Sequence, residues 1–175
     1  MSHTSPQDYT ESYAADRAEI EDLMARYLFA LDFNDMETFA TMFTPDAVFD
    51  FARGRVQGLD TIIETVKGFK KRIGEIYVDE DGNPAILRHV LAHTTIRIEG
   101  DEAWTRAQWF EMANNGPGKS LKMGTFGVYE DRLRKVNGRW LFTERKILND
   151  FLDGRHSGPE NPVRVMDAAI EGTAA

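Results

Sequence analysis

Cysteine is absent from this sequence of 175 residues. Without thiols the protein cannot form disulfides, use a thiolate nucleophile, build a zinc finger or hold an iron–sulfur cluster through cysteine.

Long apolar runs are missing too. No window approaches the roughly 18 consecutive apolar residues of a membrane span, and residues 1–16 are polar where a signal peptide would be apolar. We therefore expect a soluble, cytoplasmic protein that is not exported and has no membrane partner.

Positive charge is in deficit. Lys and Arg number 21 against 29 Asp and Glu, which gives a formal net charge of -8. Such a chain repels phosphate backbones, and this argues against a nucleic-acid partner. The rest of the composition is globular, with 42% hydrophobic and 11% aromatic residues in a length typical of one domain. Any chemistry must use His, carboxylates, Tyr, Lys, Arg, Ser or Thr.

Helical patterns occupy the first half of the chain. Asp16 and Glu19 have capping-box spacing and open an apolar period that predicts a helix to about Phe33. Asp35 is the expected N-cap of a shorter helix that stops at Pro45. The remaining predictions for this half are a strand at 47–51, a return strand at 55–58 and a helix at 60–73.

Extended patterns occupy the second half. Turn signals separate them, the clearest being Asn137-Gly138. The expected strands are 86–99, 102–113, 120–135 and 139–148. Strands joined by short turns form an antiparallel meander, so we predict an α+β fold in which helices pack on one face of a curved sheet. Residues 1–15 are predicted to be a flexible arm, 16–150 the domain, and 151–175 an irregular tail with a helical turn at 163–170.

Asp32 extends the apolar row of the first helix through Leu28 and Met24. A carboxylate on a core-facing row must be paired, and such a group suits general-base chemistry. The alternative is that Asp32 ends the helix at a solvated corner.

His89 and His93 lie four positions apart. On a helix this spacing would resemble the zinc-binding His-Glu-x-x-His motif, but Glu is absent and the following β-branched residues favour a strand. On a strand the two residues share a face roughly 13 Å apart, which disfavours a zinc pair. Each ring either points into a cavity or is a hydrogen-bonded core histidine.

Arg145 and Tyr27 are further candidates. Arg145 lies among apolar neighbours of the last strand and needs a polar or anionic partner there. It is either a functional cation or half of a structural ion pair. Tyr27, on the apolar face of the first helix, is either a core aromatic or a hydrogen-bond donor.

Four segments of the sequence, 16–20, 27–32, 43–47 and 138–140, form a recognisable set. Together they resemble the SnoaL-like branch of the nuclear transport factor 2-like superfamily, closest to the group with scytalone dehydratase, hexachlorocyclohexane dehydrochlorinase and bile acid 7α-dehydratase. The resemblance implies a cone-shaped α+β barrel that encloses a pocket. It also implies an Asp–His dyad, which Asp32 and His93 match, with Arg145 and Tyr27 to polarise a carbonyl or hold a departing oxygen.

The resemblance implies a cofactor-independent lyase without a metal. It would eliminate water, halide or a small carbonyl fragment, the last by retro-aldol cleavage, from a hydrophobic cyclic or aromatic substrate. We expect Phe49, His89, Phe110 and Phe126 to bind that substrate, although strand parity alone does not choose among the apolar residues. The strand after the histidine carries an Asp in the bile acid enzyme, and this chain offers only Arg106, Gln108 or Glu111 there.

Two other functions stay open. One is a ketosteroid-type isomerase, which uses a carboxylate on a strand; the other is a non-catalytic domain that binds a small ligand or mediates assembly. A homo-oligomer is also expected, because an open sheet would otherwise expose apolar surface on its back. The resemblance implies a trimer or a dimer.

Overall fold

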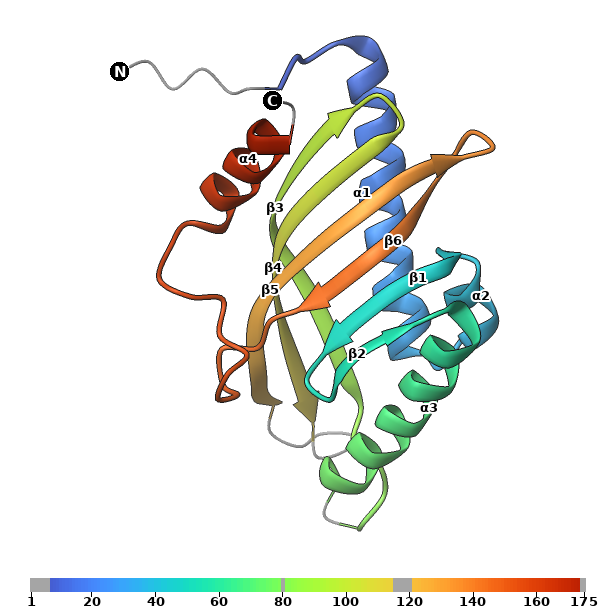
Figure 1. The fold of residues 1–175 in the computed structure, drawn as a ribbon. Helices are drawn as coiled ribbons and strands as arrows, with labels where there is room; N and C mark the ends of the chain where they lie inside the picture. The colour runs from blue at the N-terminus through green and yellow to red at the C-terminus, as the bar shows by residue number, and fades with distance from the viewer. Residues whose placement is uncertain (1–6, 80, 115–120, 174–175) are drawn as a thin grey trace.

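The computed structural model describes residues 7–79, 81–114 and 121–173, and it confirms the predicted α+β class (Figure 1). The first half contains α1 (Glu11–Asp32), α2 (Met36–Ala40), β1 (Phe43–Phe51), β2 (Gly54–Gln57) and α3 (Leu59–Ile76). The second half contains β3 (Leu87–Glu99), β4 (Glu102–Asn114), β5 (Leu121–Val136), β6 (Arg139–Ile147) and α4 (Pro162–Thr173).

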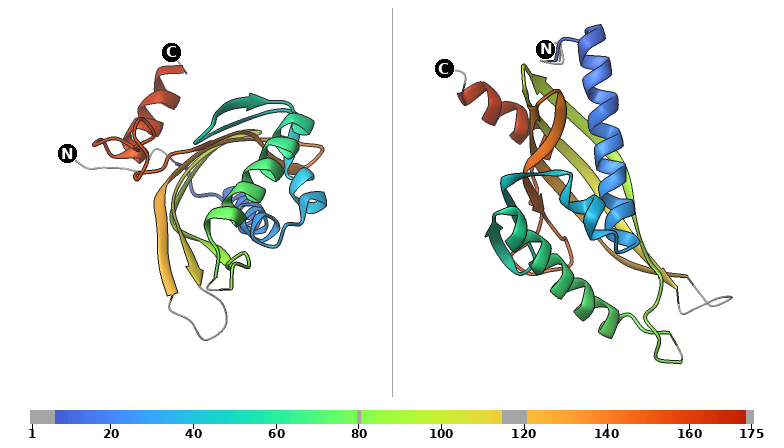
Figure 2. Two further views of the ribbon diagram at one scale, coloured as in Figure 1. Left: turned by 90° about the horizontal axis from the view of Figure 1, so that it is seen from below. Right: turned by 90° about the vertical axis from the view of Figure 1, so that its right-hand side faces the viewer.

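The strands form one curved sheet in the order β2-β1-β6-β5-β4-β3. Neighbouring strands are antiparallel except β1 and β6, which are parallel. Helices α1, α2 and α3 lie on the concave, inner side of the sheet, whereas α4 and the segment before it lie on the outer side (Figure 2). The strand β3 forms one edge, and α1 packs along it.

The start of α1 differs from the prediction. Its N-cap is Thr10, whose side chain accepts a hydrogen bond from the Tyr13 amide, so the helix begins at Glu11 and not at Asp16. Asp16 accepts hydrogen bonds from the Trp140 indole and the Lys135 ammonium, and Glu19 accepts one from the Trp140 amide. The two carboxylates therefore anchor α1 to the β5–β6 hairpin and do not cap the helix.

Two further segments differ from the predictions of the sequence analysis. The strand β1 begins at Phe43, ahead of Pro45, and its pairing with β6 shifts register between Phe43 and Val48. Because Pro45 lies in this interrupted stretch, its missing N–H fits within a strand. In the predicted irregular tail, the helical turn expected at 163–170 is part of a longer helix, α4, whose Met166 and Ile170 are buried.

The inner face of the sheet and the helices enclose an aromatic core. Tyr27 packs edge-on against Phe43, Phe142 and Tyr129, and its ring lies 5.4 Å from that of Phe39. All five side chains are buried. Burial of such rings is a main source of the free energy that stabilises a fold of this size.

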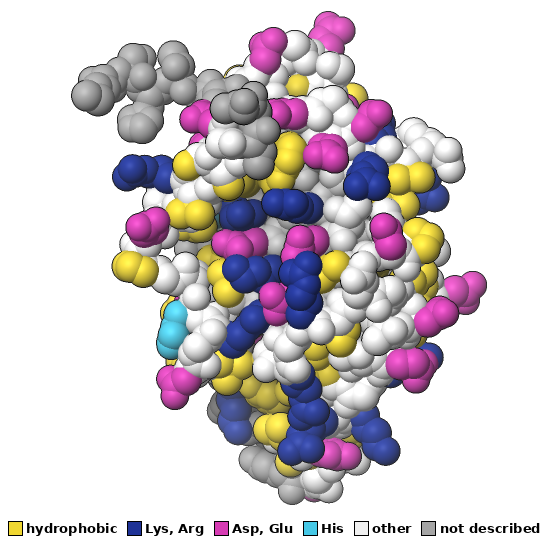
Figure 3. Space-filling model, in the orientation of Figure 1, with side chains coloured by type: hydrophobic (Ala, Val, Ile, Leu, Met, Phe, Trp, Pro, Cys, Tyr) yellow, Lys and Arg dark blue, Asp and Glu magenta, His cyan; other side chains and the backbone are white. Residues whose placement is uncertain are grey.

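The outer face of the sheet carries charge where the sequence analysis expects apolar surface. Figure 3 views this face and shows basic and acidic side chains interleaved across it. Glu130 lies 2.9 Å from Lys146 and 3.5 Å from Arg106, and Arg55 binds Glu144 at 2.8 Å. The premise for oligomerisation is therefore wrong over this area, and the oligomeric state stays a prediction.

Among the described residues, the helices are too short or too polar for any of them to cross a membrane.

Candidate active site

The last residue of α1, Asp32, binds His89 on the edge strand β3. Asp32 Oδ1 lies 2.6 Å from the ring Nδ1 of His89, and Asp32 Oδ2 accepts a hydrogen bond of 2.8 Å from the His89 backbone N–H. The Asp32 side chain is 6% exposed and the His89 side chain 13%. An edge strand has backbone N–H groups without a strand partner, so the helix end supplies the acceptor here. Asp32 is paired, as its place in an apolar row predicts.

The partner of Asp32 is His89 and not His93, which corrects the predicted dyad. The pairing of β3 with β4 shifts between Leu91 and Thr94, so Ala92 and His93 form an irregularity in the strand, and both are exposed. A bulge breaks the alternation of faces. The regular alternation that would place His89 and His93 on one face of the strand is therefore interrupted between them, and only His89 faces the helices.

Glu111 approaches the other nitrogen of the same ring. It lies opposite His89 in the register of β3 and β4, and its Oε2 is 3.4 Å from His89 Nε2. The other oxygen, Oε1, accepts hydrogen bonds from Tyr77 Oη at 3.1 Å, Thr125 N at 3.3 Å and Thr125 Oγ1 at 3.2 Å. The sequence offers Glu111 only as one of three residues on the strand after the histidine; the register of β3 against β4 is what selects it.

Two cations cover the end of α1 beside Asp32. Arg88 donates to the Asp32 carbonyl at 3.4 Å and lies 4.2 Å from the centre of the Phe33 ring. Lys70 of α3 donates to the Leu31 carbonyl. Burial lowers the pKa of Lys70, an effect that the Asp32 carboxylate opposes. Cations are favourable at a helix C-terminus, where the carbonyl groups lack intrahelical partners.

Arg145 is fully buried in an ion pair. Its Nε and Nη2 each donate at 2.8 Å to the Asp131 carboxylate. The guanidinium carbon lies 3.8 Å from the ring centre of Tyr27, 4.5 Å from that of Tyr129 and 4.2 Å from that of Phe142. Burial alone would lower the pKa of Arg145, but the Asp131 carboxylate outweighs burial and the net shift is upward. The structural ion pair considered for Arg145 is present.

An aromatic layer separates Arg145 from His89. Tyr129 contacts Arg145 and stacks on Trp109 with ring centres 5.5 Å apart, and the Trp109 ring lies 6.0 Å from the His89 ring. Tyr27 is also fully buried, and burial is the main reason that its pKa rises to about 12. Within the described part of the chain, Tyr27 Oη and Arg145 Nη1 have no hydrogen-bond partner.

The expected substrate-binding phenylalanines do not gather around His89. Phe49 is buried in the core against Phe43 and Phe51. Phe110 and Phe126 lie opposite each other in β4 and β5, and both line a cavity of about 430 Å³. Asp150 and Ser157, which precede α4, and Pro162, the first residue of α4, line the same cavity. This cavity is on the outer face, because Phe110 alternates with the inward-facing Glu111 and Trp109. Only His89, of the four predicted residues, belongs to the Asp32–His89–Glu111 cluster.

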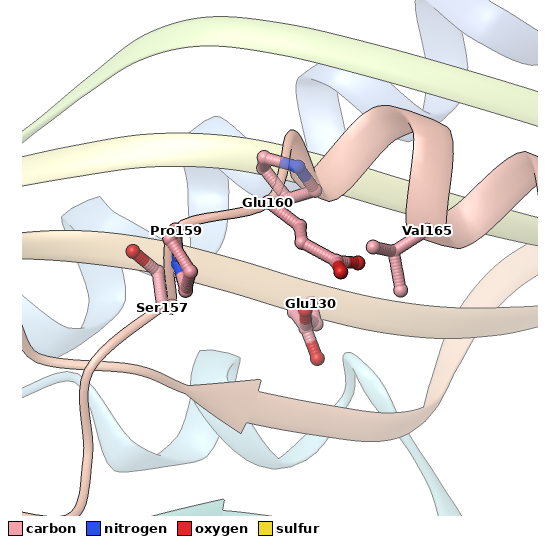
Figure 4. A pocket seen from close by; sticks show the side chains of 7 residues that line it. Glu130, Ser157, Pro159, Glu160 and Val165 are labelled. Carbon is pink, nitrogen blue, oxygen red and sulfur yellow. The ribbon is translucent and has the colours of Figure 1, made fainter.

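A second cavity of about 230 Å³ lies beside α4 on the outer face. Its walls include Glu130, Ser157, Pro159, Glu160 and Val165 (Figure 4). Neither outer cavity includes a residue of the Asp32–His89–Glu111 cluster. In the ranges that the structure describes, no set of three or more His, Asp and Glu side chains is placed to hold a metal ion.

Solved structures with the same architecture come from several bacteria. A protein from Catenulispora acidiphila is 26% identical with a TM-score of 0.68, over 81% of this chain and 96% of that one. A second structure from Catenulispora acidiphila, in complex with S-DNPA, is 26% identical with a TM-score of 0.65, over 79% and 96% of the two chains. A candidate scytalone dehydratase from Novosphingobium aromaticivorans is 21% identical with a TM-score of 0.65, over 81% and 88%, which is a likeness of fold.

Sequence comparison gives the family. The uncharacterized protein Rv2910c of Mycobacterium tuberculosis is 28% identical over 96 residues, which cover 55% of this chain and 59% of that protein. The chain thus matches less than two thirds of the length of its curated relatives. The profile of the SnoaL-like domain matches residues 12–146, most of the chain. The chain therefore belongs to the SnoaL-like domain family of the nuclear transport factor 2-like superfamily, as its sequence patterns predict.

Proposed function

We propose that the protein is a cofactor-independent lyase in which Asp32 and His89 act as an acid–base dyad. The contact that supports this most strongly is the one of 2.6 Å between Asp32 Oδ1 and His89 Nδ1. A carboxylate at this distance holds the ring proton on Nδ1, so that Nε2 carries the lone pair in the neutral ring. Nε2 is then the atom that exchanges protons with a substrate.

The proposed reaction is an elimination. His89 Nε2 takes a proton from the carbon next to the one that bears the leaving group, and the electrons of the broken C–H bond form a C=C bond. The C–O or C–halogen bond breaks with its electron pair. For a hydroxyl leaving group the imidazolium returns the proton, and water departs. In a retro-aldol cleavage His89 takes the proton of a β-hydroxyl, whose electrons form a new carbonyl; the C–C bond breaks, its electron pair passes to the adjacent carbonyl of the substrate as an enolate, and the imidazolium returns the proton to that enolate. Asp32 stabilises the imidazolium between the two transfers.

Glu111 contributes a second negative charge to the imidazole. Its Oε2 lies 3.4 Å from His89 Nε2, and its side chain is 11% exposed. When Nε2 takes a proton, the positive charge develops between two carboxylates in a site with little water. Fixed charges of this kind are effective because they need no reorganisation during the reaction. We assign Glu111 the role of stabilising the protonated His89.

Tyr27 and Arg145 are proposed to bind an oxygen of the substrate or of a water that bridges to it, because the Trp109–Tyr129 layer lies between them and His89. Among the described residues, the buried donors Tyr27 Oη and Arg145 Nη1 have no acceptor in hydrogen-bond geometry. A buried donor without an acceptor is costly, so a carbonyl, hydroxyl or water oxygen is the expected partner. The Tyr27 hydroxyl is a donor at neutral pH, since burial raises its pKa even further above neutrality, to about 12.

A hydrophobic cyclic or aromatic substrate suits the surroundings of His89. The Trp109 ring lies beside His89, and Leu91 packs against the hydrophobic core. A flat apolar molecule can stack on an indole ring, and burial of its surface contributes to binding. The complex of a 26% identical protein with S-DNPA also supports a small-molecule ligand.

The test is turnover of hydroxylated aromatic, steroidal and halogenated compounds, read as loss of water, halide or a carbonyl fragment by mass spectrometry. His89→Ala should lower kcat by at least about 100-fold, the lower range for a general acid–base group. His93→Ala is the matched control, since His93 is exposed outside the cluster. Full turnover by His89→Ala would overturn the proposal.

An isomerase is the second candidate, because Glu111 is a carboxylate on a strand with a tyrosine hydroxyl at 3.1 Å. An isomerase would convert a steroid-like ketone into a product of equal mass, with Glu111→Gln more damaging than His89→Ala. A lyase gives a product of lower mass and the reverse order of variants. Binding of the compounds without any turnover would favour the non-catalytic alternative.

A further inference from the structure

A bulge in β5 lies directly against Glu111. Phe110 pairs with Phe126 and Met112 with Met123, so that two residues of β5, Gly124 and Thr125, oppose the single residue Glu111 of β4. Bulges of this kind re-aim side chains and release backbone groups from the ladder. Here the released Thr125 N–H points at Glu111 Oε1, 3.3 Å away.

Gly124 makes room for the Glu111 side chain. A Cβ atom at position 124 would lie 2.6 Å from Glu111 Cγ and 2.7 Å from Glu111 Oε1. These distances are far below van der Waals contact, so any larger residue at 124 would displace the carboxylate. The glycine is required by the close approach of Glu111, because its backbone is not in the left-handed region.

The donors around Glu111 are themselves held in place. The Thr125 hydroxyl accepts a hydrogen bond from the Asn149 amide at 3.2 Å, which leaves its proton for Glu111. Tyr77 follows α3, and its backbone N–H and carbonyl bind Ile73 and Ala85 at 2.9 and 2.7 Å. Burial, and then the Glu111 charge, raise the pKa of Tyr77, so its hydroxyl stays a donor.

We propose that Tyr77 and the Gly124–Thr125 bulge are positioning elements that hold Oε1 of Glu111 and thereby aim Oε2 at His89 Nε2. This inference rests on the proposed role of His89, because aiming matters only if Nε2 exchanges protons. Three donors on one oxygen fix the carboxylate plane, which leaves the second oxygen free to face the imidazole. Side chains that orient a catalytic group through hydrogen bonds are a recurrent means of preorganisation.

The test uses the full chain labelled with ¹⁵N on histidine. Tyr77→Phe and Thr125→Val each remove one hydroxyl, and Gly124→Ala displaces Glu111. The His89 Nε2 resonance should move in each variant, whereas Nδ1, held by Asp32, should change little. With the substrate found by the panel, kcat should fall roughly tenfold for each lost hydroxyl at nearly constant KM. Tyr13→Phe, which loses a hydroxyl bound to the Ile96 carbonyl, is the matched control for hydroxyl loss.

The outcomes separate the inference from the proposed function. An unmoved Nε2 resonance in both Tyr77→Phe and Thr125→Val overturns the positioning role, whatever the turnover. A moved resonance with full turnover by His89→Ala overturns the lyase proposal, and the aiming then has no catalytic purpose. The two hydroxyl variants carry the test if Gly124→Ala does not fold, because they are nearly isosteric with the native residues.

Discussion

One carboxylate, that of Asp32, binds both the ring Nδ1 and the backbone N–H of His89, at 2.6 and 2.8 Å. The two contacts fix the imidazole and the edge of β3 together, so the end of α1 positions the ring and the strand at once. A shift of either element would disturb both bonds. The same carboxylate therefore holds the imidazole ring and the edge strand.

The tautomer of His89 should depend on Asp32. In the wild type the neutral ring should carry its proton on Nδ1, because the carboxylate accepts from that atom. Asp32→Ala removes the acceptor, and the Nδ1–H form should lose its dominance; the protein should also lose about 1–3 kcal/mol of unfolding free energy, since the His89 amide loses its acceptor. Long-range ¹H–¹⁵N spectra report the tautomer. An unchanged His89 tautomer would refute the role of Asp32.

The Arg145–Asp131 pair should be essential for stability. Arg145→Met leaves the buried Asp131 carboxylate without its guanidinium and with the Thr105 hydroxyl, 3.0 Å away, as a neutral donor, and should cost about 3–5 kcal/mol in urea unfolding. Asp131→Leu added to Arg145→Met should recover much of the loss, because no buried charge remains. Arg132→Met, at an exposed position of β5, the strand of Asp131, should change stability by less than about 0.5 kcal/mol. Equal effects at 145 and 132 would contradict the pairing.

Two glycine substitutions should have opposite effects on the stability of the protein. A Cβ at position 127 would lie 2.0 Å from the Leu148 carbonyl oxygen, a backbone atom that cannot yield cheaply, so Gly127→Ala should destabilise by more than about 3 kcal/mol. Gly68 lies inside α3 with no atom within 4 Å of an added Cβ. Gly68→Ala should stabilise by about 0.5–1 kcal/mol. Thermal unfolding measures both, and a neutral Gly127→Ala would show that β5 does not approach Leu148 so closely.

The contribution of Asp16 should depend on pH. Burial raises the pKa of Asp16, but the hydrogen bonds from Lys135 and Trp140 outweigh burial and hold it below the usual 3.8. A lowered folded pKa gives stability that is present above the unfolded value and is lost as the pH falls through the folded value. Asp16→Asn should therefore cost about 1 kcal/mol at pH 7 and less below pH 3. A difference that is constant between pH 7 and pH 2 would contradict this; Asp46→Asn, at an exposed position, is the control.

Much of the fold could be predicted because local signals agree with the final structure. The turn Asn137-Gly138 has φ values of 51° and 78°, the left-handed conformation that this pair adopts in tight hairpins. The predicted strand boundaries in the second half differ from the observed ones by single residues, since turn residues bound them on both sides. The start of α1 was missed because the carboxylates of Asp16 and Glu19 bind the distant Trp140, and a capping pattern cannot reveal such a partner.

The candidate site also has one part that could be predicted from the sequence and another that could not. The sequence determined that Asp32 would end the first helix on an apolar row and would need a partner, because helical periodicity is a local property. Only the tertiary structure decided which histidine and which carboxylate join it. The irregularity at Ala92 and His93 leaves only His89 facing inward, and the one at Gly124 and Thr125 makes room for Glu111. A single extra residue reverses the faces of a strand, and strand pairing, which is non-local, sets where that residue falls.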